Sequence, residues 1–285
     1  MTLRALLIVN RVKDEAAHAA EVVRTIMARH ATVIDVEAND EDLPDSTQFD
    51  IAVVVGGDGT LIGQTRRLVN RMKPIVGVNA GRLGFLAEFT TEDLATHAPL
   101  VFGSAPPLRE RMLLCVDIIR KDGSHATRGL AINDAVIAAG SPHRMIEMFL
   151  SVDADEEGVD ITGDGVILAT PTGSTAYNAS AGGPIVHPDV AGIVITPICA
   201  HSLAFRPVVV AAHELISITL RRVNHGTCVV LDGQRFVPMQ DGDELRATQH
   251  VKKALFVANP SNRYWDVLRA KMRWAAPPSY RDRGP

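Results

Sequence analysis

The feature that most restricts the fold of this chain is a charge-free apolar run that leads directly into a glycine-rich segment. Ile51–Val55 is followed by the sequence Gly-Gly-Asp-Gly-Thr at residues 56–60. A short, wholly apolar run that ends at glycines is typical of a strand buried in a parallel sheet. Glycines also let backbone amides approach a phosphate closely. The segment therefore predicts a buried strand followed by a phosphate-binding loop.

Asp58 stands at the centre of this loop, where its negative charge would repel a phosphate. A carboxylate is useful there if it orients or deprotonates the hydroxyl that attacks the phosphate, or if it holds a metal that bridges phosphate oxygens. We therefore expect a phosphotransferase with Asp58 as its catalytic residue. The alternative is a plain glycine turn with a side-chain hydrogen bond from Asp58. The expected phosphate contacts are Gly56, Gly57, Gly59 and Thr60.

Length and charge limit the class of protein. With 285 residues, the chain has enough material for one large domain or two modest ones. Its net charge of −4 argues against a general binder of nucleic acid or of anionic membranes. No 18-residue apolar run and no signal-peptide pattern is present. We expect a cytoplasmic protein with small-molecule ligands, which must be held locally by loop backbone and a few cations.

The three cysteines are far apart and form no Cys-x-x-Cys pair of the kind used for zinc or redox chemistry. Each stands in an apolar stretch, which predicts buried, inert thiols and fits a reducing compartment. They are Cys115, Cys199 and Cys228.

Strand and helix patterns alternate through the first hundred residues. Such alternation predicts βαβ units on a parallel, Rossmann-like sheet, here over residues 1–104. Ligands bind such sheets at the carboxyl ends of the strands, which is where the glycine loop falls. The expected strands are Leu3–Val9, Thr32–Val36, Ile51–Val55 and Ile75–Val78, and the expected helices are Asp14–His30, Leu61–Val69 and one capped by Thr90 or Thr91.

The pattern changes near residue 105. From there to residue 260, short apolar runs separated by turn signals predict a β-rich, sandwich-like domain. Residues 262–274 predict a closing helix that packs back on the first domain, and residues 275–285 a polar tail.

Two further segments carry candidate site residues. The loop Thr170–Thr175 has many hydroxyls and amides that could face a ligand, unless it is only a tight connection with capping hydroxyls. A short helix is expected to begin near Thr175 or Ala176, and Tyr177 either stacks on a base or is a half-buried core residue. The segment Asn79–Leu86 follows a strand and could form the opposite wall of the cleft.

Asn133 and Asp134 interrupt an apolar run, and burying them is costly unless they are paired or face a ligand. An asparagine suits a base edge and an aspartate suits a ribose diol. An exposed bulge or turn is the alternative. Arg144 could neutralise phosphate, although a lone surface arginine usually has no special role.

Taken together and in this order, these motifs resemble the NAD kinase family. The resemblance rests on Gly56–Thr60, Asn79–Leu86, Asn133-Asp134 and Thr170–Pro188, and it runs over nearly the whole chain through Asp232-Gly233-Gln234. The glycine motif alone is weak, because lipid kinases of the diacylglycerol type and phosphofructokinases have a similar one. Its combination with the hydroxyl-rich stretch is highly specific.

The resemblance implies a kinase that transfers the γ-phosphoryl group of ATP to the 2′-hydroxyl of the adenosine ribose of NAD and so makes NADP. It also implies a divalent metal such as Mg²⁺, a homo-oligomer (dimer or tetramer) and Asp58 as proton acceptor. The NAD-contacting positions that it implies are Asp58, Gly59, Asn133, Asp134, Arg144, Thr162, Asp164, Thr175, Ala176, Tyr177, Asn178, Ala179, Ser180 and Gln234.

Three positions depart from the family pattern. Asp134 stands where glutamate is more usual, and Gly63 and Thr162 stand where basic residues are often found. The two lost cations leave the choice of phosphate donor open. A lipid kinase that shares the glycine motif and a non-catalytic nucleotide-binding regulator are the alternative functions.

Overall fold

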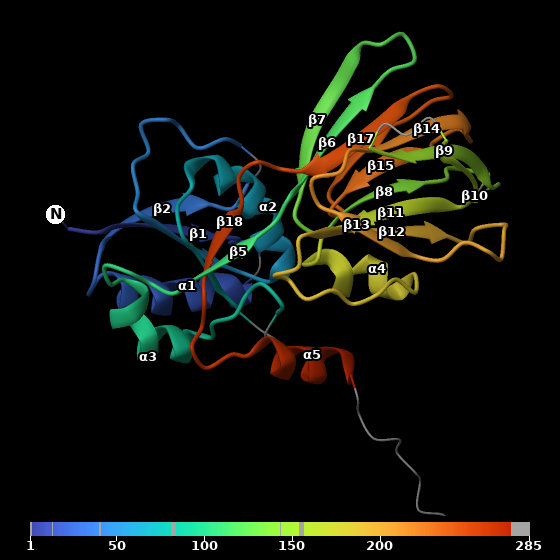
Figure 1. Ribbon diagram of the computed structural model, residues 1–285. Coiled ribbons are helices and arrows are strands. Elements are labelled where there is room, and N and C mark those ends of the chain that lie inside the picture. The colour runs from blue at the N-terminus through green and yellow to red at the C-terminus, as the bar shows by residue number, and fades with distance from the viewer. Residues whose placement is uncertain are drawn as a thin grey trace, which may run out of the picture.

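A six-stranded sheet organises the N-terminal part of the chain (Figure 1). The computed structural model describes residues 2–12, 14–39, 41–80, 84–142, 144–153 and 157–274. Across this sheet the strands are β2 (Thr32–Glu37), β1 (Arg4–Val9), β3 (Ile51–Val55), β4 (Ile75–Val78), β18 (Ala254–Val257) and β5 (Leu108–Arg111). All neighbours pair in parallel except β18 and β5.

The helices of this part cover both faces of the first sheet. They are α1 (Asp14–Met27), α2 (Asp58–Leu68), the 3₁₀ turn η1 (Val69–Arg71) and α3 (Thr91–Val101). One face packs on α1 and α3, through side chains such as Met27 and Leu94. On the other face, Leu61 of α2 shares a core with Leu113 and Ile132, which belong to the following part of the chain. Helix α2 therefore lies where the two parts of the molecule meet.

The rest of the chain forms two antiparallel sheets. In spatial order, the second sheet has β10 (Val159–Gly163), β9 (Ile146–Val152), β14 (Ile216–Arg222), β17 (Glu244–Gln249), β6 (Leu114–Ile119) and β7 (His125–Ala131). The third has β13 (Val208–Ala211), β12 (Gly192–Ile198), β11 (Gly165–Ala169), β8 (Asp134–Ala138), β15 (Cys228–Leu231) and β16 (Arg235–Pro238). Side chains of both sheets, such as Ile218 and Leu168, form one core.

These sheets confirm the predicted fold class, an α/β part followed by a β-rich sandwich. The first sheet is mixed rather than wholly parallel, because β5 runs antiparallel along its edge. β5 and β18 also join the first sheet although they lie beyond residue 104. The division of the chain into domains at that residue stays a prediction.

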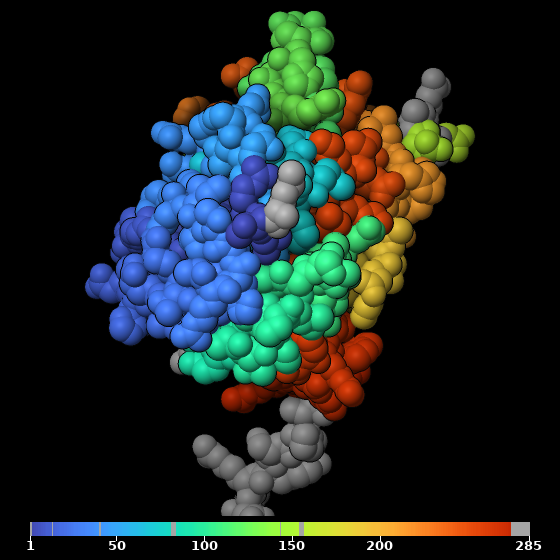
Figure 2. Space-filling view, turned by 90° about the vertical axis from the view of Figure 1, so that its left-hand side faces the viewer, coloured from blue at the N-terminus to red at the C-terminus, as the bar shows by residue number. Residues whose placement is uncertain are grey.

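Three short helical segments complete the fold: η2 (Gly173–Thr175), α4 (Tyr177–Ser180) and α5 (Tyr264–Met272). The segment that leads into α5 contacts α3, since His97 Nε2 lies 3.0 Å from Ser261 Oγ. The space-filling view shows the red C-terminal segment lying beneath the green segment that contains α3 (Figure 2). The expected tail, residues 275–285, lies outside the described residues.

Two sequence-based expectations about local structure are wrong. Helix α2 begins at Asp58 rather than at Leu61. Asp58–Thr60 form its first turn after the N-cap Gly57, although these residue types have low helix propensity and therefore did not predict a helix. None of the three cysteines is fully buried as predicted: Cys115 and Cys228 are half-buried, and Cys199, which follows β12 with a left-handed backbone (φ 46°), is exposed. The prediction for the helix near residue 90 is confirmed, with Thr90 and Asp93 forming a capping box.

Candidate active site

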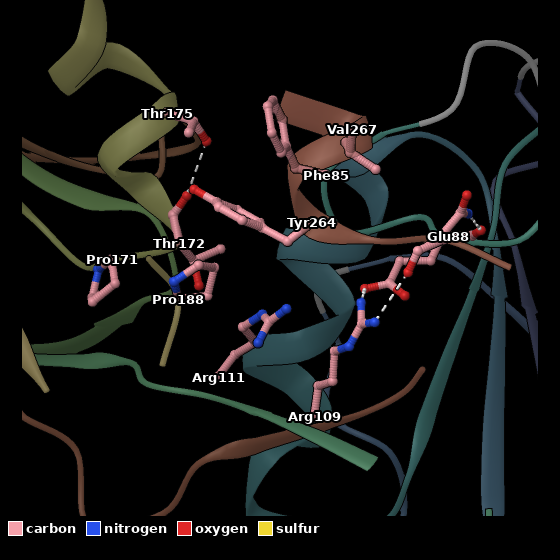
Figure 3. Close-up of a pocket in the computed structure, with 11 residues that line it drawn as sticks. Phe85, Glu88, Arg109, Arg111, Pro171, Thr172, Thr175, Pro188, Tyr264 and Val267 are labelled. Atoms are coloured by element: carbon pink, nitrogen blue, oxygen red, sulfur yellow. Dashed lines mark hydrogen bonds and ion pairs between the residues drawn. The ribbon is translucent and has the colours of Figure 1, made fainter. Parts of the chain in front are cut away.

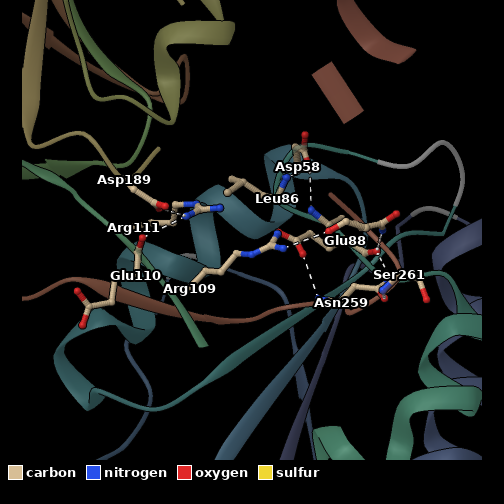
Figure 4. Close-up of polar contacts among 11 residues, drawn as sticks. Asp58, Leu86, Glu88, Arg109, Glu110, Arg111, Asp189, Asn259 and Ser261 are labelled. Atoms are coloured by element: carbon tan, nitrogen blue, oxygen red, sulfur yellow. Dashed lines mark hydrogen bonds and ion pairs between the residues drawn. The ribbon is translucent and has the colours of Figure 1, made fainter. Parts of the chain in front are cut away.

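The Asp58 carboxylate is held by backbone amides of the segment that follows β4 (Figure 4). Its Oδ2 accepts from Phe85 N at 2.9 Å, and its Oδ1 accepts from Leu86 N at 3.2 Å and from Ala87 N at 3.1 Å. A carboxylate offers about four lone-pair sites, so these bonds leave roughly one for a ligand. Because Asp58 begins α2, the contact fixes this segment against the N-terminus of the helix.

The approach is close enough to require glycine at residue 84. A Cβ built on Gly84 would overlap the carboxylate of Asp58. The expected role of Asn79–Leu86 as a cleft wall is therefore supported by its last residues, which contact the candidate catalytic group. Residues 81–83 of that segment lie outside the described part of the chain.

The Asn133–Asp134 pair lies at the start of β8. Asp134 is only 5% exposed, which excludes the alternative of an exposed turn. Burial, together with the negative charge of Asp232, raises the pKa of Asp134 to about 7. Within the described residues, the carboxylate of Asp134 accepts no hydrogen bond, and it lines a cavity with Asn133, Ala176 and Tyr177. We call this the β8 cavity.

Asp232 organises this corner of the site, although the family resemblance gave this residue no role of its own. Its fully buried carboxylate accepts from the amides of Ile132, Asn133 and Asp134 at 3.1, 2.7 and 3.2 Å. It is also paired with Arg66 of α2, with 2.6 Å between Nη1 and Oδ2. The sequence signals for Asp232 were the Asp-Gly dipeptide at residues 232–233, which also marks ordinary turns, and its place in a motif of the family resemblance.

Arg66 and Gln234 extend this network to the glycine segment. Arg66 Nη2 donates to Gln234 Oε1 at 2.6 Å, and Gln234 Nε2 donates to the carbonyl of Gly59 at 2.8 Å. We call these two residues and Asp232 the Arg66 clasp. The clasp ties the first turn of α2, which carries Asp58, to the backbone of Asn133 and Asp134.

A second cavity lies at the N-terminal end of α2. Gly57, Gly59, Thr60, Gly63 and Gln234 line it, and we call it the α2 cavity. The first amides of a helix have no partner inside the helix, so the end of α2 suits a phosphate. The expected phosphate loop is thus a helix N-terminus preceded by only two glycines.

The hydroxyl-rich loop contains two kinds of side chain. Thr170 and Ser174 are fully buried and bind backbone carbonyls, Thr170 Oγ1 to Ile132 O at 2.5 Å and Ser174 Oγ to Pro171 O at 2.6 Å. They support the tight-connection alternative. Thr172 and Thr175 line a third cavity, which Figure 3 shows, and the hydroxyl of Thr175 also donates to the carbonyl of Thr172 at 3.3 Å. Tyr177 is 48% exposed, so it is not a core residue.

Asn178 is the one buried side chain of the expected run from Thr175 to Ser180. Its amide nitrogen donates to the carbonyls of Ser174 and Pro184, each at 3.0 Å, and its oxygen accepts from Thr196 Oγ1 at 2.7 Å. These bonds use the polar atoms of Asn178 to hold α4 in place. Ala179 is half-buried and Ser180 is exposed at the end of α4.

Three of the expected ligand-contacting residues lie at the other end of the sandwich. The carbonyl of Asp164 accepts from Ala139 N, directly after β8 ends, and Thr162 and Arg144 stand close by along β10 and β9. The five residues from Asp134 to Ala139 span roughly 17 Å of extended strand. The adjacent Asp164 carboxylate raises the pKa of the exposed Cys199 thiol. The structure therefore does not bring Arg144, Thr162 and Asp164 together with Asp58.

The described ranges contain neither a cluster of metal ligands nor a membrane-spanning helix. No group of three or more His, Cys, Asp or Glu side chains able to hold a metal ion is found among those residues. Within the same ranges, no helix has both the length and the apolar character needed to cross a membrane.

The chain is similar in sequence to known NAD kinases. The family model for the ATP-NAD kinase N-terminal domain matches residues 45–103, and that for the ATP-NAD kinase C-terminal domain matches residues 132–259. The NAD kinase of Geotalea daltonii is 38% identical over 253 residues, which are 89% of this chain and 87% of the relative. That of Geobacter metallireducens is 40% identical over 256 residues, with the same two shares.

Two solved structures are similar over the whole fold. Yeast NADH kinase complexed with NADH matches with a TM-score of 0.84 and 25% identity, covering 100% of this chain and 91% of that one. An NAD kinase from Archaeoglobus fulgidus in complex with ATP matches with a TM-score of 0.75 and 27% identity, covering 95% and 99%. With both family models matched and relatives of this identity over most of its length, the chain belongs to the NAD kinase family.

Proposed function

We propose that this chain transfers the γ-phosphoryl group of ATP to the 2′-hydroxyl of the adenosine ribose of NAD. One observation carries the assignment of residues: the Arg66 clasp joins the helix that begins at Asp58 to Asn133 and Asp134. The cavity at the end of α2 and the cavity at the start of β8 are thereby held next to each other. The two ligands bound by the solved neighbours, ATP and NADH, are of the kinds that these cavities would take.

On the donor side, the phosphates of ATP would bind the N-terminus of α2 through Gly56, Gly57, Gly59 and Thr60. Partial positive charge at a helix N-terminus attracts phosphate. ATP would enter as its Mg²⁺ complex, because Mg²⁺ is commonly bound through substrate phosphates with few protein ligands. The α2 cavity supplies backbone amides and neutral side chains for this purpose.

On the acceptor side, Asn133, Asp134 and the run from Thr175 to Ser180 would hold the adenosine of NAD. Asp134 and Tyr177 face the same cavity, so a ribose and a base can lie there together. The amides from residues 85 to 87 leave one lone pair of Asp58 Oδ2 to accept the proton of the ribose 2′-hydroxyl. Phosphoryl transfer needs in-line positioning and charge stabilisation more than covalent help, and the clasp supplies the positioning.

The remaining expectations are also proposals. Arg144, Thr162 and Asp164 would contact NAD only if the dinucleotide is extended along the sandwich, since Asp164 bonds to Ala139, roughly 17 Å along the strand from Asp134. A homo-oligomer and a cytoplasmic location follow from the family resemblance.

The test is NADP formation by the purified protein with NAD, ATP and Mg²⁺, with a diacylglycerol acceptor assayed in parallel. Asp58→Asn should lower kcat at least about a hundredfold, the lower end of general-base effects. Asp45→Asn, which changes a fully exposed carboxylate, is the matched control. Near-normal turnover of folded Asp58→Asn protein would contradict the role of Asp58, and phosphorylation of the lipid without NADP formation would favour a lipid kinase.

A further inference from the structure

A small cavity lies between α5, the hydroxyl-rich loop, β5 and the segment that follows β4 (Figure 3). Phe85, Pro171, Pro188 and Val267 give it apolar walls, and Arg111 and Tyr264 bring polar atoms to it. Its free volume is about 20 Å³, which is room for about one water-sized particle. Phe85 and Thr175 also border the proposed site, but the proposed phosphotransfer gives no role to Arg111 or Tyr264.

Arg111 is the unusual residue of the cavity, because it is a buried cation with few partners. It is 6% exposed, and its Nη1 donates to the carbonyl of Glu110 at 3.2 Å. Among the described residues, its one ion pair is a long contact of 3.8 Å with Asp189, whose side chain is 74% exposed (Figure 4). A guanidinium has five N–H donors, and burying a charge without close partners is costly. Desolvation lowers the pKa of Arg111, in keeping with that cost.

The other charged groups around Arg111 are already paired. Arg109 Nη1 lies 2.7 Å from Glu88 Oε1, and Glu88 Oε2 accepts from the amide of Asn259 at 3.1 Å. Glu88 therefore acts on Arg111 as a nearby negative charge that favours its charged form, but among the described residues it forms no hydrogen bond or ion pair with Arg111. The hydroxyl of Tyr264 is buried and has no hydrogen-bond partner among the described residues. In Figure 3 the Tyr264 ring lies above the Arg111 guanidinium, with Arg109 and Glu88 to one side.

We infer that this cavity binds one small monovalent anion, such as chloride or formate, between the guanidinium of Arg111 and the hydroxyl of Tyr264. An anion there would give the buried cation a close counter-charge and the buried hydroxyl an acceptor. The size of the cavity favours an ion of a few atoms over phosphate esters or nucleotides. A bound anion would compete for Arg111 with the protein's own carboxylate at Asp189, which lies on the exposed side.

The site also touches the catalytic corner. Phe85 lines the cavity with its side chain while its amide donates to Asp58, and Thr175 lines the cavity from the proposed NAD-contacting run. A bound anion would therefore stabilise the segment that fixes Asp58. We expect small anions to raise the thermal stability of the protein and to reduce opening of this segment.

The experiment compares the melting temperature in sodium chloride, sodium formate and sodium gluconate at equal ionic strength. Gluconate is too large for the cavity, so the wild-type protein should melt higher in chloride and formate than in gluconate. Arg111→Gln should lose this difference. Asp189→Asn should reach half of its chloride response at about a two- to fivefold lower concentration, since a competing exposed carboxylate is removed.

Asp160→Asn is the matched control, because Asp160 forms an exposed ion pair with Arg221 far from the cavity. It should respond as the wild type does. Equal melting in all three salts, or the same response in Arg111→Gln as in the wild type, would overturn the inference. If Arg111→Gln fails to fold, an Asp189→Asn response identical to that of Asp160→Asn would overturn it. In crystals soaked in bromide, an anomalous peak should lie beside the Arg111 guanidinium, and its absence would also overturn the inference.

Discussion

Arg66 on α2 and Asp232 between β15 and β16 form a buried ion pair with 2.6 Å between Nη1 and Oδ2. The side chain of Arg66 is 10% exposed and that of Asp232 is fully buried. Because Asp232 also accepts the amides of residues 132–134, this one carboxylate fixes the start of β8 relative to α2. The pair therefore connects helix α2, which begins at Asp58, to the residues of the proposed adenosine site.

Replacing Arg66 with methionine should lower the free energy of unfolding by about 3 kcal/mol or more, because it leaves Asp232 buried without its cation. The KM for NAD should rise, since Asn133 and Asp134 lose their fixed position. Urea unfolding and steady-state kinetics measure the two effects. Arg246→Met, which removes an exposed pair with Glu244, is the control and should cost less than about 1 kcal/mol. Equal costs for the two variants would contradict the role of the clasp.

Gly84→Ala should disturb Asp58 although the substitution adds a single methyl group. That methyl would overlap the Asp58 carboxylate, so either the segment at residues 84–87 or the carboxylate must move. We expect stability to fall by about 1–3 kcal/mol, as for other overpacked sites, and kcat to fall with it. Gly57→Ala is the control for crowding, because a Cβ there meets nothing within 4 Å, so it should cost only the weaker N-cap of α2. A Gly84→Ala protein with wild-type stability and kcat would show that the close approach of residue 84 to Asp58 is not needed for folding or catalysis.

The sequence allowed the buried strand Ile51–Val55 and the strand Ile75–Val78 to be predicted with the right bounds, because a charge-free run between turn residues has few other solutions. It also drew attention to Asn133 and Asp134, since polar residues inside an apolar run need a reason, and Asp134 is buried; their contact with NAD stays a prediction. Both predictions depended on local pattern alone.

What the sequence did not reveal depends on contacts between distant residues. Arg66 and Asp232 are 166 residues apart, and each alone resembles an ordinary surface arginine or a turn aspartate. The sequence also did not show which hydroxyls of the hydroxyl-rich loop are structural and which face a cavity, because Thr170 and Thr172 have the same side chain and similar neighbours. Only their different places relative to β8 make the first structural and leave the second facing a cavity.

Gly63→Arg should strengthen binding of ATP. Gly63 lines the α2 cavity one turn into the helix, and an ordinary residue there would meet Gln234 Oε1 at 3.4 Å, at the edge of normal contact. The added cation would lie near the proposed phosphate site, so we expect a lower KM for ATP that weakens with salt. Removing glycine from a helix interior should also add up to about 1 kcal/mol of stability. Gly63→Ala separates the effects, because it should gain stability without lowering KM; equal KM values in both variants would contradict the charge effect.

Asp134 should make both stability and NAD binding depend on pH. Its pKa is raised from 3.8 to about 7 in the folded protein, so between these values the folded state holds a proton that the unfolded state releases. Folding stability therefore declines as pH rises from about 4 to about 7, and the penalty is complete above pH 7, on the order of 4 kcal/mol at most. Below pH 4 both states are protonated and the penalty is absent.

Asp134→Asn carries no charge at any pH, so its stability advantage over the wild type should be near zero at pH 4 and should grow until about pH 7–8. Urea unfolding over this pH range measures it. An ionised Asp134 is the better acceptor for ribose hydroxyls, and the wild-type KM for NAD should therefore fall as pH rises through 7. The KM of the variant should show no such change with pH. A difference in stability between the two proteins that does not vary with pH would show that the pKa of Asp134 is not raised in the folded protein.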